Sequence, residues 1–157
     1  MRTPGRRDAL QVNKRKLLVA WAAGFIDGEG CFLISAQRQK NRNLIPQYVG
    51  FLSVEQKDPS PLYILQALWG GSIRRKKTSQ TSFASSPYHY EWCVRSFVAR
   101  DALIELLPFL QTRVEKAKLI ILLYEMPFGK GKRDALQQTA LYNKFRELKI
   151  LASVASN

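Results

Sequence analysis

The chain has 157 residues, 46% of them hydrophobic, which is enough for one domain with a buried core. Lys and Arg number 25 against 12 Asp and Glu, and this net charge of +13 favours nucleic acid ahead of a membrane as partner. No apolar run is long enough to span a membrane, and the first residues lack the apolar segment of a secretory signal. We therefore expect an intracellular protein, in the cytoplasm of a prokaryote or in an organelle, and not a secreted one.

Residues 1–16 are rich in Lys and Arg and contain no periodic apolar segment. We expect a loose basic N-terminal arm here, which either adds nonspecific phosphate contacts or only solvates the chain. Residues 17–157 would then form a single domain.

Residues 17–28 predict an amphipathic helix. Leu18, Trp21, Ala22 and Phe25 recur at i, i+3, i+4 and i+7 and form one apolar face. A different face carries only small side chains and one acid, which would let another backbone approach closely. Its residues are Ala20, Ala23, Gly24 and Asp27. Two glycines within three residues end the helix, and the alternating residues of a strand follow at once.

Asp27 and Glu29 lie at the carboxyl end of this helix, where the macrodipole is already negative. A carboxylate there is disfavoured by about 0.3–1 kcal/mol. One interpretation is a solvated turn, because Asp and Gly are common turn residues. The other is that carboxylates and a freed backbone carbonyl bind a divalent cation, since Mg²⁺ favours such hard oxygen ligands. The small-residue face and the basic composition favour the second interpretation.

The rest of the chain alternates hairpins and helices. Strands are predicted at 31–39, 47–56, 72–78 and 88–95. Helices are predicted between an N-cap at Asp58 or Ser60 and Gly70, over 97–110 and 111–126, and from Asp134 onward. Two hairpins pairing into one antiparallel sheet, with helices on its apolar face, give an α+β layer of order αββαββα followed by further helices. The other face of the sheet would be polar, basic and concave.

This polar face has two features that suit nucleic acid. The first hairpin presents amide and hydroxyl side chains, which are either merely solubilising or suited to adenine in the major groove. The strand at 72–78 carries four consecutive cations, which repel one another unless an anion arrives. On the return strand, His89, Glu91 and Arg95 would share the outer face with two of these cations. A lone histidine such as His89 is more often a surface residue than a catalyst.

Motifs of other chemistry are absent from the sequence. There is no phosphate-binding GxxxxGK, no glycine-rich dinucleotide turn, no HExxH and no zinc-ligand spacing. Cys31 and Cys93 fall in predicted strands, so we expect two buried free thiols in a reducing compartment.

The segment Ala22-Ala23-Gly24-Phe25-Ile26-Asp27-Gly28-Glu29-Gly30, preceded by Leu17, Leu18 and Trp21, resembles the LAGLIDADG motif of homing endonucleases. The order of the later elements is similar to that of the single-motif members from Lys16 to Leu151. The resemblance implies a saddle-shaped antiparallel sheet with helices on one face. It also implies that two copies pack through the small-residue face into a homodimer.

The resemblance assigns a candidate site residue by residue. Glu29 fills the acidic position that binds Mg²⁺ in the family, together with the backbone carbonyl of Gly28. Aspartate is the more common occupant of that position, so the longer glutamate changes the metal geometry slightly. Gln56 falls where the family often has a glutamine that orders active-site water, and Arg113 falls where it often has a lysine near the scissile phosphate. Asp27 would be a structural, capping acid rather than a catalytic one.

One position departs from the family's pattern. Some members have a further basic residue where this chain has Ser60, and Lys57 is the nearest substitute.

The implied activity is that of a site-specific homing endonuclease. It would make a staggered double-strand cut in a long pseudo-palindromic DNA target by Mg²⁺-dependent phosphodiester hydrolysis. The expected base or phosphate contacts, each of which is otherwise solvated surface, are Leu33, Ser35, Gln37, Gln39, Gln47, Ser53, Arg74 and Lys76. The alternatives on the same fold are an intron RNA maturase and a DNA-binding regulator without catalysis.

Overall fold

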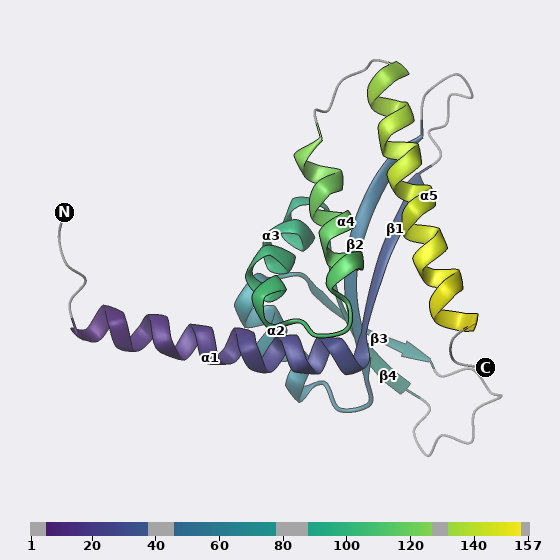
Figure 1. Ribbon diagram of the computed structural model, residues 1–157. Coiled ribbons are helices and arrows are strands. Elements are labelled where there is room, and N and C mark those ends of the chain that lie inside the picture. The colour runs from purple at the N-terminus through teal and green to yellow at the C-terminus, as the bar shows by residue number, and fades with distance from the viewer. Residues whose placement is uncertain (1–5, 38–45, 78–87, 127–131, 155–157) are drawn as a thin grey trace.

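The protein is an α+β layer in which helices cover one face of a four-stranded antiparallel sheet (Figure 1). The computed structural model describes residues 6–37, 46–77, 88–126 and 132–154. The elements are α1 (Arg6–Glu29), β1 (Gly30–Gln37), β2 (Gln47–Gln56), α2 (Ser60–Trp69), β3 (Ser72–Lys77), β4 (Tyr88–Arg95), α3 (Ser96–Leu106), the short 3₁₀ helix η1 (Leu107–Phe109), α4 (Val114–Glu125) and α5 (Lys132–Val154). This order confirms the predicted αββαββα arrangement with additional helices after it.

The strand order is β1-β2-β4-β3, and every neighbouring pair is antiparallel. The predicted alternation is confirmed along β1, β2 and the second half of β4, where one side of the strand faces the helices and the core. The buried side chains of the sheet are Phe32, Ile34, Tyr48, Leu52, Val54, Trp92 and Val94. Ala36, predicted to face the core, is exposed near the end of β1.

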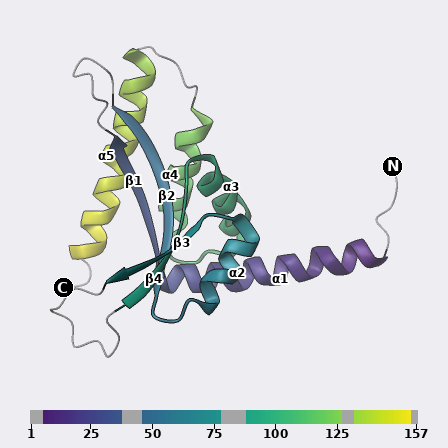
Figure 2. The same ribbon diagram turned by 180° about the vertical axis from the view of Figure 1, so that it is seen from behind.

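Helix α1 begins at Arg6, so the prediction of a loose arm is wrong for residues 6–16. No glycine or proline interrupts the chain between Arg6 and Ala23. A tertiary contact also holds the added turns. The guanidinium of Arg15 donates to both carboxylate oxygens of Glu105 on α3, with the shortest distance 2.9 Å, and to the carbonyl of Leu68 on α2 at 3.3 Å. The N-terminal half of α1 projects away from the rest of the molecule in both views (Figures 1 and 2).

The core face of α1 differs from the predicted apolar face. The buried side chains are Val19, Ala22, Ala23 and Ile26, whereas Leu18 and Trp21 are 43% and 42% exposed. The observed face is rotated from the predicted one by about 100°, the angle of a single residue. The reason is steric: α1 packs against α3 and η1. Small Ala22 and Ala23 allow that close approach, so the large ring of Trp21 remains outside.

Strand β2 is attached to α4 through Gly50. The hydroxyl of Tyr124 accepts a hydrogen bond from the backbone N–H of Gly50 at 2.7 Å. A Cβ at this glycine would lie 2.7 Å from Cγ2 of Ile120 and 3.2 Å from the ring of Tyr124. The absence of a side chain therefore lets α4 approach the sheet.

The later helices begin and end close to the predicted residues. The N-cap of α2 is Pro59, so the prediction of Asp58 or Ser60 as N-cap is wrong. Asp58 instead accepts hydrogen bonds from the backbone N–H and the hydroxyl of Ser60 at 2.9 and 2.7 Å, and α2 ends at Gly70 as predicted. The predicted helix over 97–110 is shorter, because α3 ends at Leu106 and the 3₁₀ helix η1 begins at Leu107. Phe97, which was assigned to its apolar face, is 47% exposed.

We predict that Gly50→Ala lowers the free energy of unfolding by about 1–3 kcal/mol, because the added methyl group overpacks the contact with α4. Urea unfolding followed by circular dichroism would measure it. Ser53→Ala on the outer face of the same strand is the control and should change stability by less than about 0.5 kcal/mol. Equal effects of the two substitutions would contradict the close-packing argument.

Candidate nucleic-acid interface and catalytic centre

The outward face of the sheet brings the predicted contact residues together. Strand alternation and register place seven of them on this one face: Leu33, Ser35, Gln37, Gln47, Ser53, Arg74 and Lys76. Gln37 lies opposite Gln47, and Arg74 lies opposite Glu91. Gln39 lies outside the described residues.

The same face contains residues that were not predicted to contact DNA. Leu33, Phe51 and Arg95 form one row across β1, β2 and β4, and Arg95 is exposed. The alternation along β4 was signal enough to find Arg95 as a candidate contact. Cys31 and Cys93 also lie on this face, exposed and half-buried respectively, so the expectation of two buried thiols is wrong.

Lys76 on the outward face is bound by two carboxylates of the chain itself. Its ammonium lies 2.8 Å from Oε1 of Glu55 on β2 and 2.8 Å from Oε1 of Glu91 on β4. Hydrogen bonds to Glu55 and then Glu91 raise the pKa of Lys76. Nε2 of His89 lies 3.4 Å from Oε2 of Glu55. The repulsion along the basic strand is therefore relieved internally at Lys76, without the external anion that the sequence suggested.

The helix-to-strand corner after α1 exposes the candidate metal-binding residues. Gly28 and Glu29 are the last two residues of α1, and both are exposed. Gly30 follows as the first residue of β1. A Cβ at Gly30 would lie 2.5 Å from the carbonyl oxygen of Ile26, so only glycine fits this close approach of helix and strand. The corner therefore fixes Glu29 at the end of the sheet.

Asp27 anchors this corner to the segment before α4. Its carboxylate accepts hydrogen bonds from the backbone N–H groups of Gln111 at 2.6 Å, Thr112 at 3.3 Å and Arg113 at 3.3 Å. The hydroxyl of Thr112 donates a fourth bond at 3.0 Å. Partial burial opposes ionisation, but these bonds outweigh it and lower the pKa of Asp27. Asp27 therefore has a structural role at this corner, where it connects the end of α1 to the segment before α4.

Arg113 lies against the carboxyl end of α1. Its Nε–H donates to the carbonyl oxygen of Asp27 at 3.1 Å, and its guanidinium lies 5.9 Å from the ring centroid of Phe32. A cation at a helix carboxyl end is favourable because it meets the negative pole of the helix. Arg113 is distant from α1 in the sequence, but it contacts Asp27, which lies two residues before Glu29.

Gln56 lies at the same end of the first hairpin as Glu29. Gly30 pairs with Val54, so Glu29 and the last two residues of β2 lie at the same end of this hairpin. Gln56 is half-buried there. The hydroxyl of Ser60 donates a hydrogen bond to Asp58. Lys57, the basic residue that directly follows Gln56 in the sequence, is exposed.

The donor set at the corner fits a divalent cation only in part. Within the described residues no group of three or more His, Cys, Asp or Glu side chains converges. Glu29 supplies one carboxylate, and the last carbonyls of α1 lack helical partners and are hard oxygen donors. One chain therefore offers an open, oxygen-rich part of a cation site rather than a closed one.

The four residues expected at a dimer interface differ in how accessible they are to a second copy. Ala23 is fully buried in the core of its own chain, so the prediction that it contacts a second copy is wrong. The carboxylate of Asp27 is occupied within the chain, Ala20 is half-buried and Gly24 is exposed. The side of α1 opposite the core instead presents an exposed stripe, which we call the outer stripe: Leu17, Trp21, Gly24 and Gly28.

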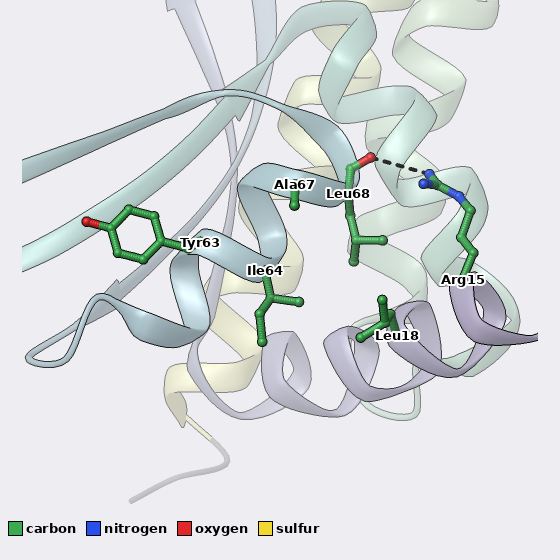
Figure 3. A pocket seen from close by; sticks show the side chains of 6 residues that line it. All are labelled: Arg15, Leu18, Tyr63, Ile64, Ala67 and Leu68. Atoms are coloured by element: carbon green, nitrogen blue, oxygen red, sulfur yellow. Dashed lines mark hydrogen bonds between the residues drawn. The ribbon is translucent and has the colours of Figure 1, made fainter. Parts of the chain in front are cut away.

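A groove with a volume of about 500 Å³ lies beside this helix, between α1 and α2 (Figure 3). Arg15 lies at one end and Tyr63 at the other, and the walls between them are apolar. The lining residues are Arg15, Leu18, Tyr63, Ile64, Ala67 and Leu68. No sequence pattern had indicated the groove, because it depends on the packing of α1 across α2.

Comparison with known families identifies this arrangement. A family model described as LAGLIDADG endonuclease matches residues 22–100, just over half of the chain. The chain belongs to the LAGLIDADG endonuclease family. The predicted family and fold are thereby confirmed. No curated protein sequence matches the chain.

Solved structures of homing endonucleases share the fold. The homing endonuclease I-CvuI, in complex with a DNA target in the presence of Mg, is 26% identical, with a TM-score of 0.72 over 86% of this chain and 83% of that chain. The archaeal intron-encoded homing endonuclease I-Vdi141I, in complex with DNA, is 18% identical, with a TM-score of 0.68 over 83% of each chain. The DNA-bound meganuclease I-SmaMI is 18% identical, with a TM-score of 0.57 over 79% of this chain but only 42% of that chain.

Membership of the LAGLIDADG family places the protein among DNA endonucleases. The matched residues 22–100 include the corner at Glu29 and all four strands, whereas Arg113 lies outside them. Among the described helices, none has the length and apolar character needed to cross a membrane.

We predict that Asp27→Asn lowers the free energy of unfolding at pH 7 by about 0.5–2 kcal/mol, the usual range for losing a capping carboxylate. Since folding lowers the pKa of Asp27, the stabilisation is full above the unfolded pKa of about 3.8 and disappears as the pH falls through the lowered folded value. The difference between wild type and variant should therefore narrow in acid. Urea titrations at several pH values would test this, and a difference that does not change with pH would contradict it.

Proposed function

We propose that this protein is a site-specific homing endonuclease that makes a staggered double-strand cut in a long pseudo-palindromic DNA target by Mg²⁺-dependent phosphodiester hydrolysis. The observation that carries the proposal is the exposed carboxylate of Glu29 at the corner between α1 and the outward face of the sheet. An acid at a helix carboxyl end destabilises the helix slightly, so a purely structural reason for it is lacking.

The outward face of the sheet is the proposed DNA-binding surface. It combines amides and hydroxyls with exposed basic residues such as Arg74 and Arg95, in a chain with a net charge of +13. Basic side chains supply affinity for phosphates, and amides can read base edges in the major groove. I-CvuI, which is 26% identical, was solved with its DNA target, and this supports the same class of partner here.

The proposed chemistry uses the residues at the corner. Glu29 and the carbonyl of Gly28 would hold a divalent cation, which supplies an activated water and stabilises the charge that develops on phosphate oxygens. Arg113 keeps its charge at any ordinary pH, so it would stabilise a phosphate but cannot donate a proton. The amide of Gln56 can both donate and accept a hydrogen bond, which suits a residue that orients water.

Two copies would be needed for a double-strand cut. The described part of the chain contains one corner of this kind, and two-fold symmetry in the protein is mirrored by a pseudo-palindromic target. The outer stripe of α1 offers exposed Leu17 and Trp21 beside the small Gly24, and the apolar groove extends this surface toward α2. Pairing of the two α1 helices would bring both corners close together, so the cuts in the two strands would be offset.

We predict that Glu29→Gln abolishes cleavage and retains binding. Both proteins would be incubated with a library of long randomised duplexes in Mg²⁺, and the cut ends sequenced. Wild type should yield staggered cuts at one pseudo-palindrome, and the variant should cut at least about 10³-fold more slowly. Glu125→Gln, an exposed acid at the end of α4, is the matched control and should cut normally. EDTA should stop wild-type cleavage.

Binding without cutting by the wild type, in any divalent cation, would overturn the nuclease proposal. A preference for intron RNA over duplex DNA would then indicate a maturase, and selective duplex binding would indicate a regulator.

We predict that Gly24→Lys converts a dimer to a monomer at micromolar concentration in sedimentation velocity. A Cβ at Gly24 would have no atom within 4 Å in one chain, so the substitution is tolerated by the isolated fold. At a tight pairing of two helices the lysine would separate them. Ala140→Lys, at an exposed position of α5, adds the same charge and should leave the dimer intact. A wild-type monomer would refute the two-copy arrangement.

A further inference from the structure

The outward face contains a cluster whose charge differs from that of the chain as a whole. We call Glu55, Lys76, His89 and Glu91 the charge cluster. Register places Glu55 directly opposite Glu91, and like charges so placed repel unless a cation bridges them. Lys76 is that bridge, at 2.8 Å from each carboxylate. His89 lies 3.4 Å from the second oxygen of Glu55 and holds that side chain from the other side.

The cluster is unsuited to a DNA phosphate. Lys76 and the two glutamates alone sum to −1, in a chain whose net charge is +13. To bind a phosphate, Lys76 would have to leave two charge-assisted hydrogen bonds, and both carboxylates would then face the anion. A DNA duplex lying on this sheet would therefore present bases rather than backbone to the cluster.

The donors and acceptors of the cluster match one base pair. An ammonium has three N–H donors, and two of those of Lys76 point to Glu55 and Glu91, which leaves one. The side chain of Glu55 is 51% exposed, compared with 19% for Glu91, so Glu55 is the more accessible acceptor. In the major groove guanine presents two acceptors, O6 and N7, and cytosine presents the N4 donor. A thymine would instead place its methyl group against charged side chains.

We propose that the charge cluster reads one G·C pair in each half of the DNA target. The third N–H of Lys76 binds guanine, and the carboxylate of Glu55 accepts from N4 of the paired cytosine. Glu91 and His89 are positioning residues that hold Lys76 and Glu55 in place. The proposal rests on the proposed function, because it needs a duplex on the outward face of the sheet. It turns Lys76 from a general contact into a base-specific one.

The test is a binding selection from randomised duplexes in Ca²⁺, so that no step depends on cleavage. Wild type should show a G·C preference of roughly 5- to 150-fold at one position of each half-site, the usual range for a good contact. Glu55→Gln should weaken the preference for G·C and admit a T·A pair, because an amide pairs with adenine and O4 of thymine can accept from Lys76 in place of guanine.

Lys76→Met alone would leave two glutamates facing each other, so it is combined with Glu91→Gln. This double variant keeps the net charge and should lose the G·C preference. The control is Lys77→Met with Glu125→Gln, which makes the same charge changes at exposed positions outside the outward face and should keep the preference.

Salt dependence gives a second readout. Loss of a phosphate contact lowers the slope of log K against log salt by about one unit, whereas loss of a base contact leaves it unchanged. We expect no change in slope for the Lys76 double variant. A lower slope with an unaltered sequence preference would overturn the inference and leave the proposed function standing. Wild type that enriches no sequence at all would overturn both.

Discussion

The structure depends on the attachment of the carboxyl end of α1 to the segment before α4. Asp27 makes this attachment with four hydrogen bonds to Gln111, Thr112 and Arg113, and Arg113 returns one to the carbonyl of Asp27. These bonds connect residues more than 80 positions apart in the sequence, so one carboxylate places a helix end, a loop and a cation together. Without this carboxylate the backbone N–H groups of Gln111, Thr112 and Arg113 would lose their acceptor at this corner.

This attachment separates the tasks of two neighbouring acids. Asp27 is occupied by donors of its own chain, and its pKa is lowered by them. Glu29, two residues later, is the last residue of α1 and is exposed. The backbone of Gly30 lies so close to Ile26 that only glycine fits there, and the exposed Glu29 comes immediately before this close approach. One acid is therefore structural, and its neighbour is left available to a ligand.

The parts of the fold that could be predicted are those that local sequence determines. Alternation along β2 and β4 gave the buried face, including Leu52 and Trp92, because a strand can present only two sides. The faces of α1 were not predictable in this way. A helix rich in Leu, Ala and Trp has several faces that could be buried, and the face that is buried depends on how closely the neighbouring helices pack. The helical turns before Leu17 also depend on a distant partner, Glu105, which no local pattern reveals.

The same reasoning explains what was missed at the candidate site. The motif and its acid could be read from consecutive residues, and so could the alternating polar face. The partners of Lys76 could not, because Glu55 and Glu91 come from two other strands and meet it only through the sheet register. Arg113 was located by resemblance alone, and its bond to the end of α1 needed three dimensions. Long-range pairing is the information that a single sequence does not contain.

The continuity of α1 from Arg6 to Glu29 has a practical consequence for engineering. Twenty-four residues of helix form a rod about 36 Å long. A reporter, an affinity tag or a second effector domain joined before Arg6 would be held at that distance from the corner, with its direction set by the helix rather than by a flexible tether. Changing the length of this rod by single residues would rotate the attached module in steps of about 100°, which makes α1 a built-in spacer.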